Sequence, residues 1–422
     1  MYRKYKKKLV VISTIIPSDY GARPKVVLNY LKILSEKYDY NISLIIINNH
    51  IQCFDTPFFL DGVYFFNQPH KLIQITQILI NSLILRKSPM QSYLFWSPFL
   101  NKKIKNLVTK LNPDIVFCEL IRTALFGINI NFPNILDMAD LLSRRYGQQL
   151  KNISDYSNIT GQYEKTYPKF IRKIINSAKI KYFILNMEYQ LTRDFENNVV
   201  KYFNLTTLVS THEVKMLIKT SNNNKIQWLP NGIDIKNEFF PSDKINNKII
   251  SFIGILDNPH NEFGVLYFID EIFPLVLEKV PDAIFQVIGR NPSNKIISRK
   301  QKNIIITGYV ENLNDYIDKS TITVVPLKIG SGVKTKIFDS IKFGVPVVAT
   351  SLGAEGVINE LSEYIYVHDD ANEFAQECAR LLLDNVYLKK DIRAKGFEII
   401  KNNYSWESIG AKLQMLISQT SK

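Results

Sequence analysis

The chain has 422 residues, of which 46% are hydrophobic and 22% are charged; this composition is that of a globular protein, and the length allows two domains. The formal net charge is +14, and all of the excess lies in the first half: residues 1–201 contain 28 Lys and Arg against 14 Asp and Glu, and the remainder contains 25 of each. The three cysteines form no C-x-x-C pair, so neither a disulfide framework nor a zinc site is indicated, and a reducing cytoplasm is expected.

The amino-terminal segment is basic, but its apolar run is short, ends at Pro17 and lacks a small-residue cleavage site. It therefore predicts a buried first strand and no signal peptide. No segment reaches about eighteen uninterrupted apolar residues, so we expect no transmembrane helix.

The basic first half suits an anionic partner. We find no helix-turn-helix, zinc-finger or RNP-type pattern, so we expect no nucleic-acid partner. An anionic membrane surface is the other candidate, which would make the protein cytoplasmic with a possible peripheral position on the inner face of the cell membrane. That lysine is simply abundant in this chain remains an open alternative.

Short β-branched segments alternate with longer helical patterns from end to end, which predicts parallel sheets with helices on both faces. The expected strands lie at residues 8–16, 42–47, 114–119, 134–138, 206–210, 248–256, 283–289, 303–310, 321–327, 345–350 and 364–367. Residues 229–248 are rich in Pro, Gly, Asn and Asp and predict a linker. We therefore predict an α/β protein with two doubly wound, Rossmann-like domains, at residues 1–240 and 241–403.

One helical segment, "KLIQITQILINSLILRK" at residues 71–87, places Gln74, Gln77 and Asn81 on one face and leucine and isoleucine on the others. We expect a buried helix with one solvent-facing polar stripe. A helix lying in a lipid interface is the alternative.

Residues 329–336 read "IGSGVKTK" and join an expected strand to an expected helix. The phosphate-binding loop of nucleotide hydrolases carries a glycine before its lysine, whereas Val333 precedes Lys334 here. The segment is therefore not a P-loop, although its glycines and lysines suit a phosphate.

Ligands of open parallel sheets bind beyond the carboxyl ends of the strands. In the first half, Gly21 follows the first expected strand, and Arg23 or Lys25 opens the next helix. In the second half, residues 257–264 and 329–336, together with the residues that follow two further strands, offer glycines, amides or cations at one sheet edge. These loops predict a nucleoside-diphosphate site.

Residues 252–292, 304–317 and 322–357 resemble, in order and spacing, the retaining GT-B glycosyltransferases of family four, in particular bacterial exopolysaccharide and capsule sugar transferases. The resemblance covers most of residues 205–410. It implies two Rossmann-like domains facing a central cleft and a C-terminal helix, residues 404–422, that crosses back to the N-terminal domain. It also implies transfer of a sugar from a UDP- or GDP-sugar to a lipid-linked or growing surface-polysaccharide acceptor. The nucleotide sugar is then a co-substrate, and no cofactor or obligatory metal is expected.

In this family the loop at residues 330–336 holds the donor diphosphate. The resemblance implies that Gly330, Ser331 and Gly332 present backbone amides to the phosphates, and that Lys334 and Lys336 neutralise them and the leaving group. It further places Asp339 at the ribose, where the family usually has a glutamate. The partner glutamate of that pair would fall on the serine of the loop.

Other contacts with the donor follow from the same resemblance. Tyr309 and Val310 would meet the base through their backbone groups. Arg290 would touch phosphate, or lie in an exposed turn. The sugar ring would rest near Gly353 and Glu355, where a helix is expected to start.

The acceptor side is less determined. Asp137 ends a strand and Asp140 lies one turn further, so we take both as catalytic or positioning candidates. Glu119 and Arg122 form a second pair, which could instead cap the following helix. His260 lies on a donor-side loop.

Two alternatives remain open. A nucleotide-sugar epimerase of the same fold would need acid and base groups on both domains, and would act without an acceptor. A decayed transferase that only binds a partner is suggested by the serine in place of the usual acid. A dinucleotide dehydrogenase is disfavoured because no G-x-G-x-x-G follows the first strand of either domain.

Overall fold

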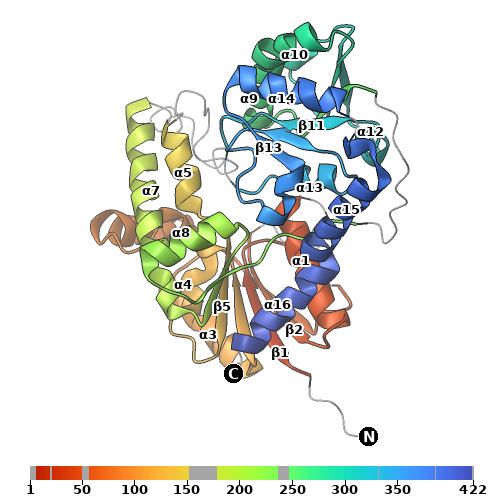
Figure 1. The fold of residues 1–422 in the computed structure, drawn as a ribbon. Coiled ribbons are helices and arrows are strands. Elements are labelled where there is room, and N and C mark those ends of the chain that lie inside the picture. The colour runs from red at the N-terminus through yellow and green to blue at the C-terminus, as the bar shows by residue number, and fades with distance from the viewer. Residues whose placement is uncertain are drawn as a thin grey trace, which may run out of the picture. The chain divides into compact units, whose positions relative to one another are not determined.

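The computed structural model describes residues 6–19, 21–49, 57–151, 178–235, 247–330, 332–384 and 386–420 (Figure 1). These residues form two compact units. The first unit holds the chain as far as Gly232 and takes it up again from Trp406, and the second extends from Ile233 to Ser405. The second unit is thus inserted into the first.

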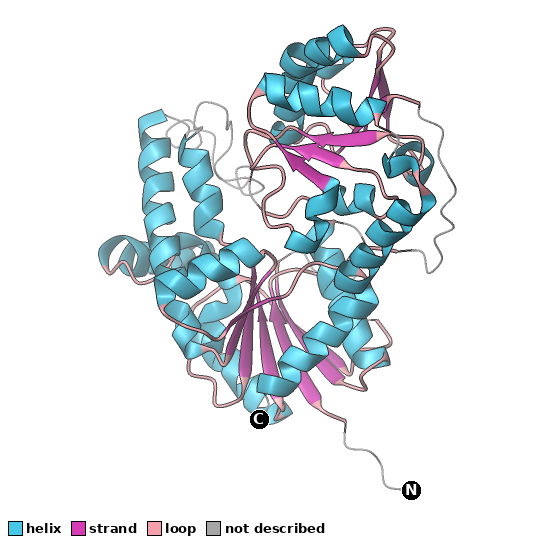
Figure 2. Cartoon of the chain, in the orientation of Figure 1, coloured by secondary structure: helices cyan, strands magenta, loops and turns pink. Residues whose placement is uncertain are grey.

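The first unit is built on a seven-stranded parallel sheet with the order β3-β2-β1-β4-β5-β6-β7 (Figure 2). The strands are β1 (Lys8–Ser13), β2 (Asn41–Ile47), β3 (Gly62–Phe66), β4 (Ile115–Glu119), β5 (Asn134–Ala139), β6 (Leu205–Leu208) and β7 (Ile226–Trp228). The helices are α1 (Ala22–Glu36), α2 (Lys71–Gln77), the π-helix η1 (Ile78–Ile84), η2 (Met90–Leu94), α3 (Pro98–Leu111), η3 (Ile121–Thr123), α4 (Ala124–Gly127), α5 (Leu142–Lys151), α7 (Ala178–Val199), η5 (Val200–Tyr202), α8 (Thr211–Ser221) and α16 (Trp406–Thr420).

Both faces of this sheet are buried, because successive side chains of a strand point to opposite sides. Val10 and Ile12 of β1 belong to one apolar core, and Leu9 and Val11 belong to the other. The terminal helix α16 contributes Leu413, among others, to the second core. The last helix of the chain therefore completes the unit that the first strand begins.

The second unit has a six-stranded parallel sheet with the order β10-β9-β8-β11-β12-β13. Its strands are β8 (Ile249–Ile253), β9 (Ile284–Ile288), β10 (Ile304–Gly308), β11 (Ile322–Val325), β12 (Val347–Ala349) and β13 (Ile365–Val367). Its helices are α9 (Pro259–Tyr267), η6 (Phe268–Ile272), α10 (Phe273–Lys279), α11 (Asn294–Ile297), α12 (Asn314–Ile317), α13 (Thr335–Ile341), η7 (Asn359–Tyr364), α14 (Ala371–Leu383), η8 (Val386–Leu388) and α15 (Lys390–Tyr404).

The predicted fold class, an α/β protein with two Rossmann-like parallel sheets, is confirmed. Every strand expected from the sequence is present, and of the strands in the described ranges β3 and β7 were not expected. These two strands lie at the two edges of the first sheet, where fewer positions are buried. Residues 236–246 of the predicted linker lie outside the described part of the chain.

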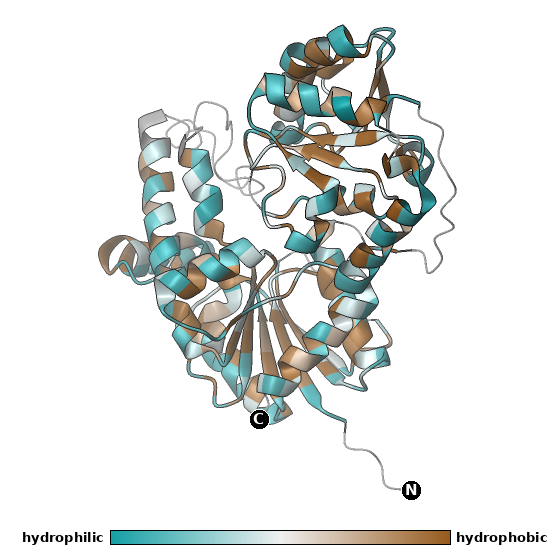
Figure 3. Cartoon of the chain, in the orientation of Figure 1, coloured by the Kyte–Doolittle hydropathy of each residue, from teal (hydrophilic) through white to brown (hydrophobic). Residues whose placement is uncertain are grey.

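The expectation for the helix over residues 71–84 was wrong. Neither α2 nor η1 is buried: their leucine and isoleucine side chains are largely exposed, and the only buried residue is Ser82. In Figure 3 this segment is the brown, apolar helix at the left edge of the view. The structure also shows that none of the helices in the described ranges is long and apolar enough to cross a bilayer.

Candidate nucleotide-sugar site and a buried charge cluster

In the second unit the chain starts at β8 in the middle of the sheet, runs outward to β9 and β10, and then returns to β11 on the other side of β8. Such a reversal of strand order leaves a crevice beyond the carboxyl ends of the two central strands, and this is where ligands of doubly wound sheets bind. The segments that follow the two central strands, β8 and β11, run to α9 and α13 at this position. The second of these is the glycine- and lysine-containing loop.

Two lysines enter this region from the same loop and helix. Lys336, in the first turn of α13, donates from Nζ to Oδ1 of Asn261 at 2.7 Å, and Nζ lies 4.1 Å from the centre of the Phe252 ring. Lys334 is buried, and its Nζ donates to the carbonyl of Gly332 at 2.5 Å. No carboxylate pairs with Lys336 among the described residues. The ammonium group of Lys336 is therefore held by neutral groups only.

The pKa values of Lys336 and His260 reflect the absence of a neighbouring negative charge among the described residues. Burial, and then the neighbouring Lys334, lower the pKa of Lys336 from its usual value to about 7. Burial and the two lysines lower the pKa of His260 to about 4, so its imidazole is neutral at pH 7. Excess positive charge at a sheet edge is what a bound anion would relieve.

The loop backbone has conformations that glycine adopts readily. Gly330 has φ +120° and Gly332 has φ +76°, in the left-handed half of the map that other residues rarely adopt. A Cβ at Gly330 would come within 3.5 Å of the Cβ of His260, which places the loop against α9. Ser331, to which a phosphate contact was assigned, lies outside the described residues.

The segment after β12 is tied to the same loop. Thr350 donates from Oγ1 to the carbonyl of Leu327 at 2.6 Å and accepts a hydrogen bond from the backbone N–H of Gly353 at 3.0 Å. A Cβ on Gly353 would lie 2.3 Å from the carbonyl oxygen of Val325, so only glycine fits. The expected helix start at this segment is wrong: residues 351–356 form turns, and Glu355 is half-buried within them.

The other residues assigned to the donor lie at the same sheet edge but are more exposed. Arg290 is exposed, and its carbonyl accepts from the N–H of Leu256 at 2.9 Å, which joins the loops after β9 and β8. Tyr309 and Val310 follow β10, and the Tyr309 ring is exposed. Asp339, on α13, accepts from Nζ of Lys342 at 2.9 Å.

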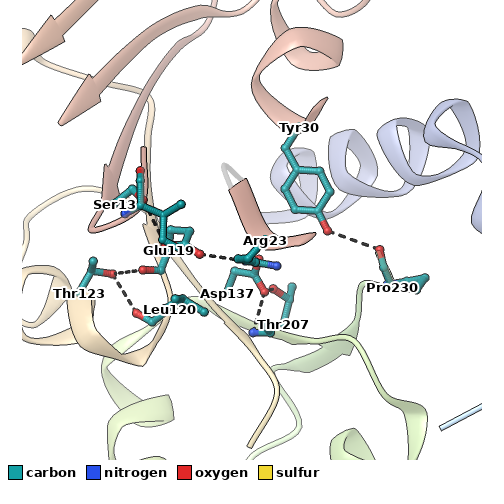
Figure 4. A network of polar contacts seen from close by, with 11 residues as sticks. Ser13, Arg23, Tyr30, Glu119, Leu120, Thr123, Asp137, Thr207 and Pro230 are labelled. Carbon is teal, nitrogen blue, oxygen red and sulfur yellow. Dashed lines mark hydrogen bonds and ion pairs between the residues drawn. The ribbon is translucent and has the colours of Figure 1, made fainter. Parts of the chain in front are cut away.

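In the first unit the strand order also reverses, between β1 and β4, and a buried charge cluster occupies this place (Figure 4). Arg23, in the first turn of α1, donates from Nε to Oε1 of Glu119 at 2.9 Å and from Nη2 to Oδ2 of Asp137. Both carboxylates are buried, and Ser13 and Thr207 donate to their other oxygens at 3.1 and 3.0 Å. We call Arg23, Glu119 and Asp137 the arginine cluster.

The arginine cluster formally carries one positive charge against two negative ones, and both carboxylates are buried. Burial raises the pKa of Glu119, and the guanidinium of Arg23 opposes this rise. Gly21, with φ +90°, is the residue before α1 and lets the chain turn so that Arg23 enters the cluster. The cluster anchors the start of α1 to the ends of β4 and β5.

The remaining acceptor-side candidates, Asp140 and Arg122, bind other partners than the arginine cluster. Asp140 pairs with Arg145 at 2.5 Å, apart from the arginine cluster. Arg122 donates from Nε to Gln91 at 3.3 Å. The predicted pair of Glu119 and Arg122 is therefore replaced by the pair of Glu119 and Arg23. No group of three or more His, Cys, Asp or Glu side chains suited to a metal ion is found within the described ranges.

Sequence reasoning missed two partners. The sequence indicated Arg23 only as one of two basic residues at the start of a helix. Nothing in the sequence showed that its side chain bonds to residues at the ends of two strands. Asn261 was not singled out, although it is buried and accepts from Lys336 while donating to the carbonyl of Ile255 at 2.9 Å. Its position next to His260, at the start of a helix after a central strand, was the available signal.

Two Rossmann-like units, each with its polar groups at a reversal of strand order, are the arrangement of GT-B proteins, and comparison with solved structures supports this class. Sucrose-phosphate synthase from Thermosynechococcus elongatus superimposes with a TM-score of 0.60 at 13% identity, covering 98% of this chain and 99% of that one. HepE from Anabaena, solved with UDP and glucose, gives 0.56 at 13% identity, covering 98% and 100%. TarM gives 0.59 at 13% identity, covering 99% and 100%. At this identity the likeness establishes the GT-B fold.

The family match is to the second unit. Residues 247–384 match the family model described as glycosyl transferases group 1, and the resemblance to glycosyltransferases inferred from the sequence is confirmed. A Klebsiella pneumoniae protein, described as an uncharacterized 44.6 kDa protein in the cps region, is 27% identical over 193 residues, which are 43% of this chain and 49% of that protein. The match thus spans about half the length of this curated relative.

Proposed function

We propose that the protein is a retaining glycosyltransferase that moves a sugar from a UDP- or GDP-sugar to a lipid-linked or growing surface-polysaccharide acceptor. The observation that carries the proposal is the pair Lys334 and Lys336 beside the loop at Gly330 and Gly332, at the reversal of strand order in the group 1 domain. In this proposal the two ammonium groups bind the diphosphate and stabilise the negative charge that develops on it as the glycosidic bond breaks.

The comparisons support the donor and acceptor classes. HepE has been solved with UDP and with UDP-glucose, and a TarM variant of S. aureus with UDP and a GlcNAc-glycerol. The relative described as lying in a cps region points to a surface polysaccharide. We assign the first unit to the acceptor, and Asp137 and Asp140 to positioning the acceptor hydroxyl. In this proposal Asp137 acts through Arg23, since both of its carboxylate oxygens already accept hydrogen bonds.

A thermal-shift panel of UDP, GDP, ADP and CMP tests the donor site. A nucleotide at 100 times its dissociation constant raises the free energy of unfolding by about 2.7 kcal/mol, which is readily seen as a higher Tm. Lys336→Met should abolish the shift, whereas the matched exposed control Lys300→Met should keep it. A panel in which no nucleotide raises the Tm of the wild-type protein would refute the donor site.

Product analysis tests the reaction. With the matching nucleotide sugar and a lipid-linked or oligosaccharide acceptor, NMR of the product should show the anomeric configuration of the donor retained. Without an acceptor, the sugar of the donor should stay unchanged. Isomerisation of the sugar under these conditions would identify an epimerase. Binding without any transfer or hydrolysis would identify a protein that only binds the nucleotide.

A further inference from the structure

The helix formed by α2 and η1, residues 71–84, is attached to the first unit by its polar side. Gln74 donates from Nε2 to the carbonyl of Leu94 at 3.0 Å. Ser82 is fully buried and donates from Oγ to the carbonyl of Ser88 at 2.9 Å. Asn81 lies between them and donates to the side chain of Gln77 at 2.8 Å. The polar stripe that would face water in an ordinary surface helix thus faces the protein.

The opposite side of the helix presents apolar side chains outward. The exposed residues are Leu72, Ile73, Ile75, Leu79, Ile80, Leu83, Ile84 and the adjoining Leu85. Leu72 is 69% exposed and Ile84 is 74% exposed. Soluble monomers rarely expose a contiguous group of this kind, and where they do it marks an interaction surface. We call this group the apolar face.

The charged residues of the chain segment that contains the apolar face have one sign. Residues 62–113 contain seven Lys and Arg and no Asp or Glu. Lys71 begins the helix, and Arg86 and Lys87 follow its end; all three are exposed. The chain segment that contains the apolar face therefore complements a negatively charged surface.

The start of α3 carries the same combination of an exposed apolar group and cations. Phe99 is exposed, and Nζ of Lys103 lies 4.4 Å from the centre of its ring. This helix begins four residues after Leu94, the residue that holds Gln74. Aromatic and basic side chains are enriched where proteins meet the headgroup region of a bilayer.

We propose that the apolar face of residues 71–85 inserts into the surface of an anionic lipid bilayer, while Lys71, Arg86 and Lys87 contact lipid phosphates. At about 1.5 Å per residue the helix is roughly 20 Å long, shorter than the ~30 Å hydrocarbon layer, so it lies along the interface. The membrane contact does not depend on nucleotide chemistry. Only its use, to bring the first unit to a lipid-linked acceptor, rests on the proposed function.

Flotation of the full-length protein with vesicles tests the proposal. The wild-type protein should float with vesicles of phosphatidylcholine and phosphatidylglycerol and much less with phosphatidylcholine alone, and added salt should weaken the binding. The double variant Leu72→Gln/Ile84→Gln should bind the anionic vesicles at least about tenfold more weakly. The matched control Ile297→Gln/Leu383→Gln, which replaces two exposed apolar residues of the second unit, should bind as the wild-type protein does.

A second pair of variants tests the charge. Arg86→Gln/Lys87→Gln should weaken binding to anionic vesicles by about tenfold and reduce its dependence on salt. The control Lys300→Gln/Lys302→Gln removes two exposed charges of the second unit and should change neither. All four variants alter exposed side chains, so their Tm values should match that of the wild-type protein.

Three results would overturn the proposal. One is a wild-type protein that does not float with anionic vesicles. Another is unchanged binding by Leu72→Gln/Ile84→Gln. The third is a wild-type dimer in sedimentation that this double variant converts to a monomer, without vesicle binding, which would assign the apolar face to a second copy of the chain. Because the nucleotide thermal shift is read independently, a failure here is distinct from a failure of the donor site.

Discussion

The lowered pKa of Lys336 predicts that the affinity for a nucleoside-diphosphate sugar decreases as the pH rises above 7. In the free protein the Lys336 ammonium is buried near Lys334, and its pKa is lowered to about 7. A phosphate oxygen about 4 Å from the ammonium would attract it by about 4 kcal/mol at an effective dielectric constant of 20. Since one pKa unit corresponds to about 1.4 kcal/mol, this attraction returns the pKa of Lys336 to nearly its usual value in the complex.

The bound state then holds a proton that the free state releases above pH 7. The dissociation constant should therefore rise by up to about tenfold between pH 7.5 and pH 8.5. For the protein without ligand, the stability changes with pH in the opposite direction to the affinity. The unfolded chain keeps the lysine proton up to the usual pKa of 10.5, so the free energy of unfolding should increase between about pH 7 and pH 10.5.

Isothermal titration of the nucleotide sugar at several pH values measures this linkage. Lys336→Met, which removes the charge but keeps the length of the side chain, should bind weakly and with little change over the same pH range. The pH dependence that remains in Lys336→Met measures the contribution of the ionisation of the nucleotide base. Lys300→Met should show the wild-type slope. A wild-type dissociation constant that is constant from pH 7.5 to 8.5, or an equal slope in Lys336→Met, would refute the reasoning.

Three further predictions concern the stability of the two units. Arg23→Met leaves the buried carboxylate of Glu119 without its cation. In urea denaturation, the free energy of unfolding should fall by about 3 to 5 kcal/mol at pH 7 and by less at pH 5. Equal losses at the two pH values would contradict this prediction. Gly353→Ala brings a Cβ within 2.3 Å of the Val325 carbonyl oxygen and should cost at least about 1 to 3 kcal/mol; an unchanged Tm would show that this turn is free to move. Burial raises the pKa of Glu196 to about 8, so between pH 4.5 and pH 8 the folded protein holds a proton that the unfolded chain has released. The free energy of unfolding should therefore decrease as the pH rises over this range. Glu196→Gln should flatten this part of the plot of Tm against pH, and parallel plots for the variant and the wild-type protein would contradict the prediction.

Most of the fold could be predicted because the buried strands are short segments rich in β-branched residues, as in β2 (Asn41–Ile47) and β11 (Ile322–Val325). The edge strands β3 and β7 were missed because an edge strand has one neighbour and needs fewer apolar positions. The helix over residues 71–84 was read with its faces reversed. An amphipathic pattern shows that a helix has two faces, but only the tertiary structure shows which of them the protein binds.

The glycine- and lysine-containing loop could be recognised from local sequence, since Gly330, Gly332, Lys334 and Lys336 lie within one short segment. The assigned roles of these residues stay predictions until a ligand is bound. The arginine cluster could not be recognised in this way. Arg23 precedes Glu119 by 96 residues and Asp137 by 114, and only the adjacency of β1, β4 and β5 brings the three together.

The insertion of one unit within the other has a consequence for biosynthesis. Gly232 has no side chain where the Trp406 indole lies, since a Cβ there would come within 2.2 Å of a ring atom, and Gly410 fits closely against Ile33. On the ribosome, the first unit therefore cannot complete its second core until α16 has been made, which happens only after the whole second unit has been translated. A premature stop codon that removes only this helix would leave the second unit whole and would expose the apolar surface of the first unit to proteases and chaperones.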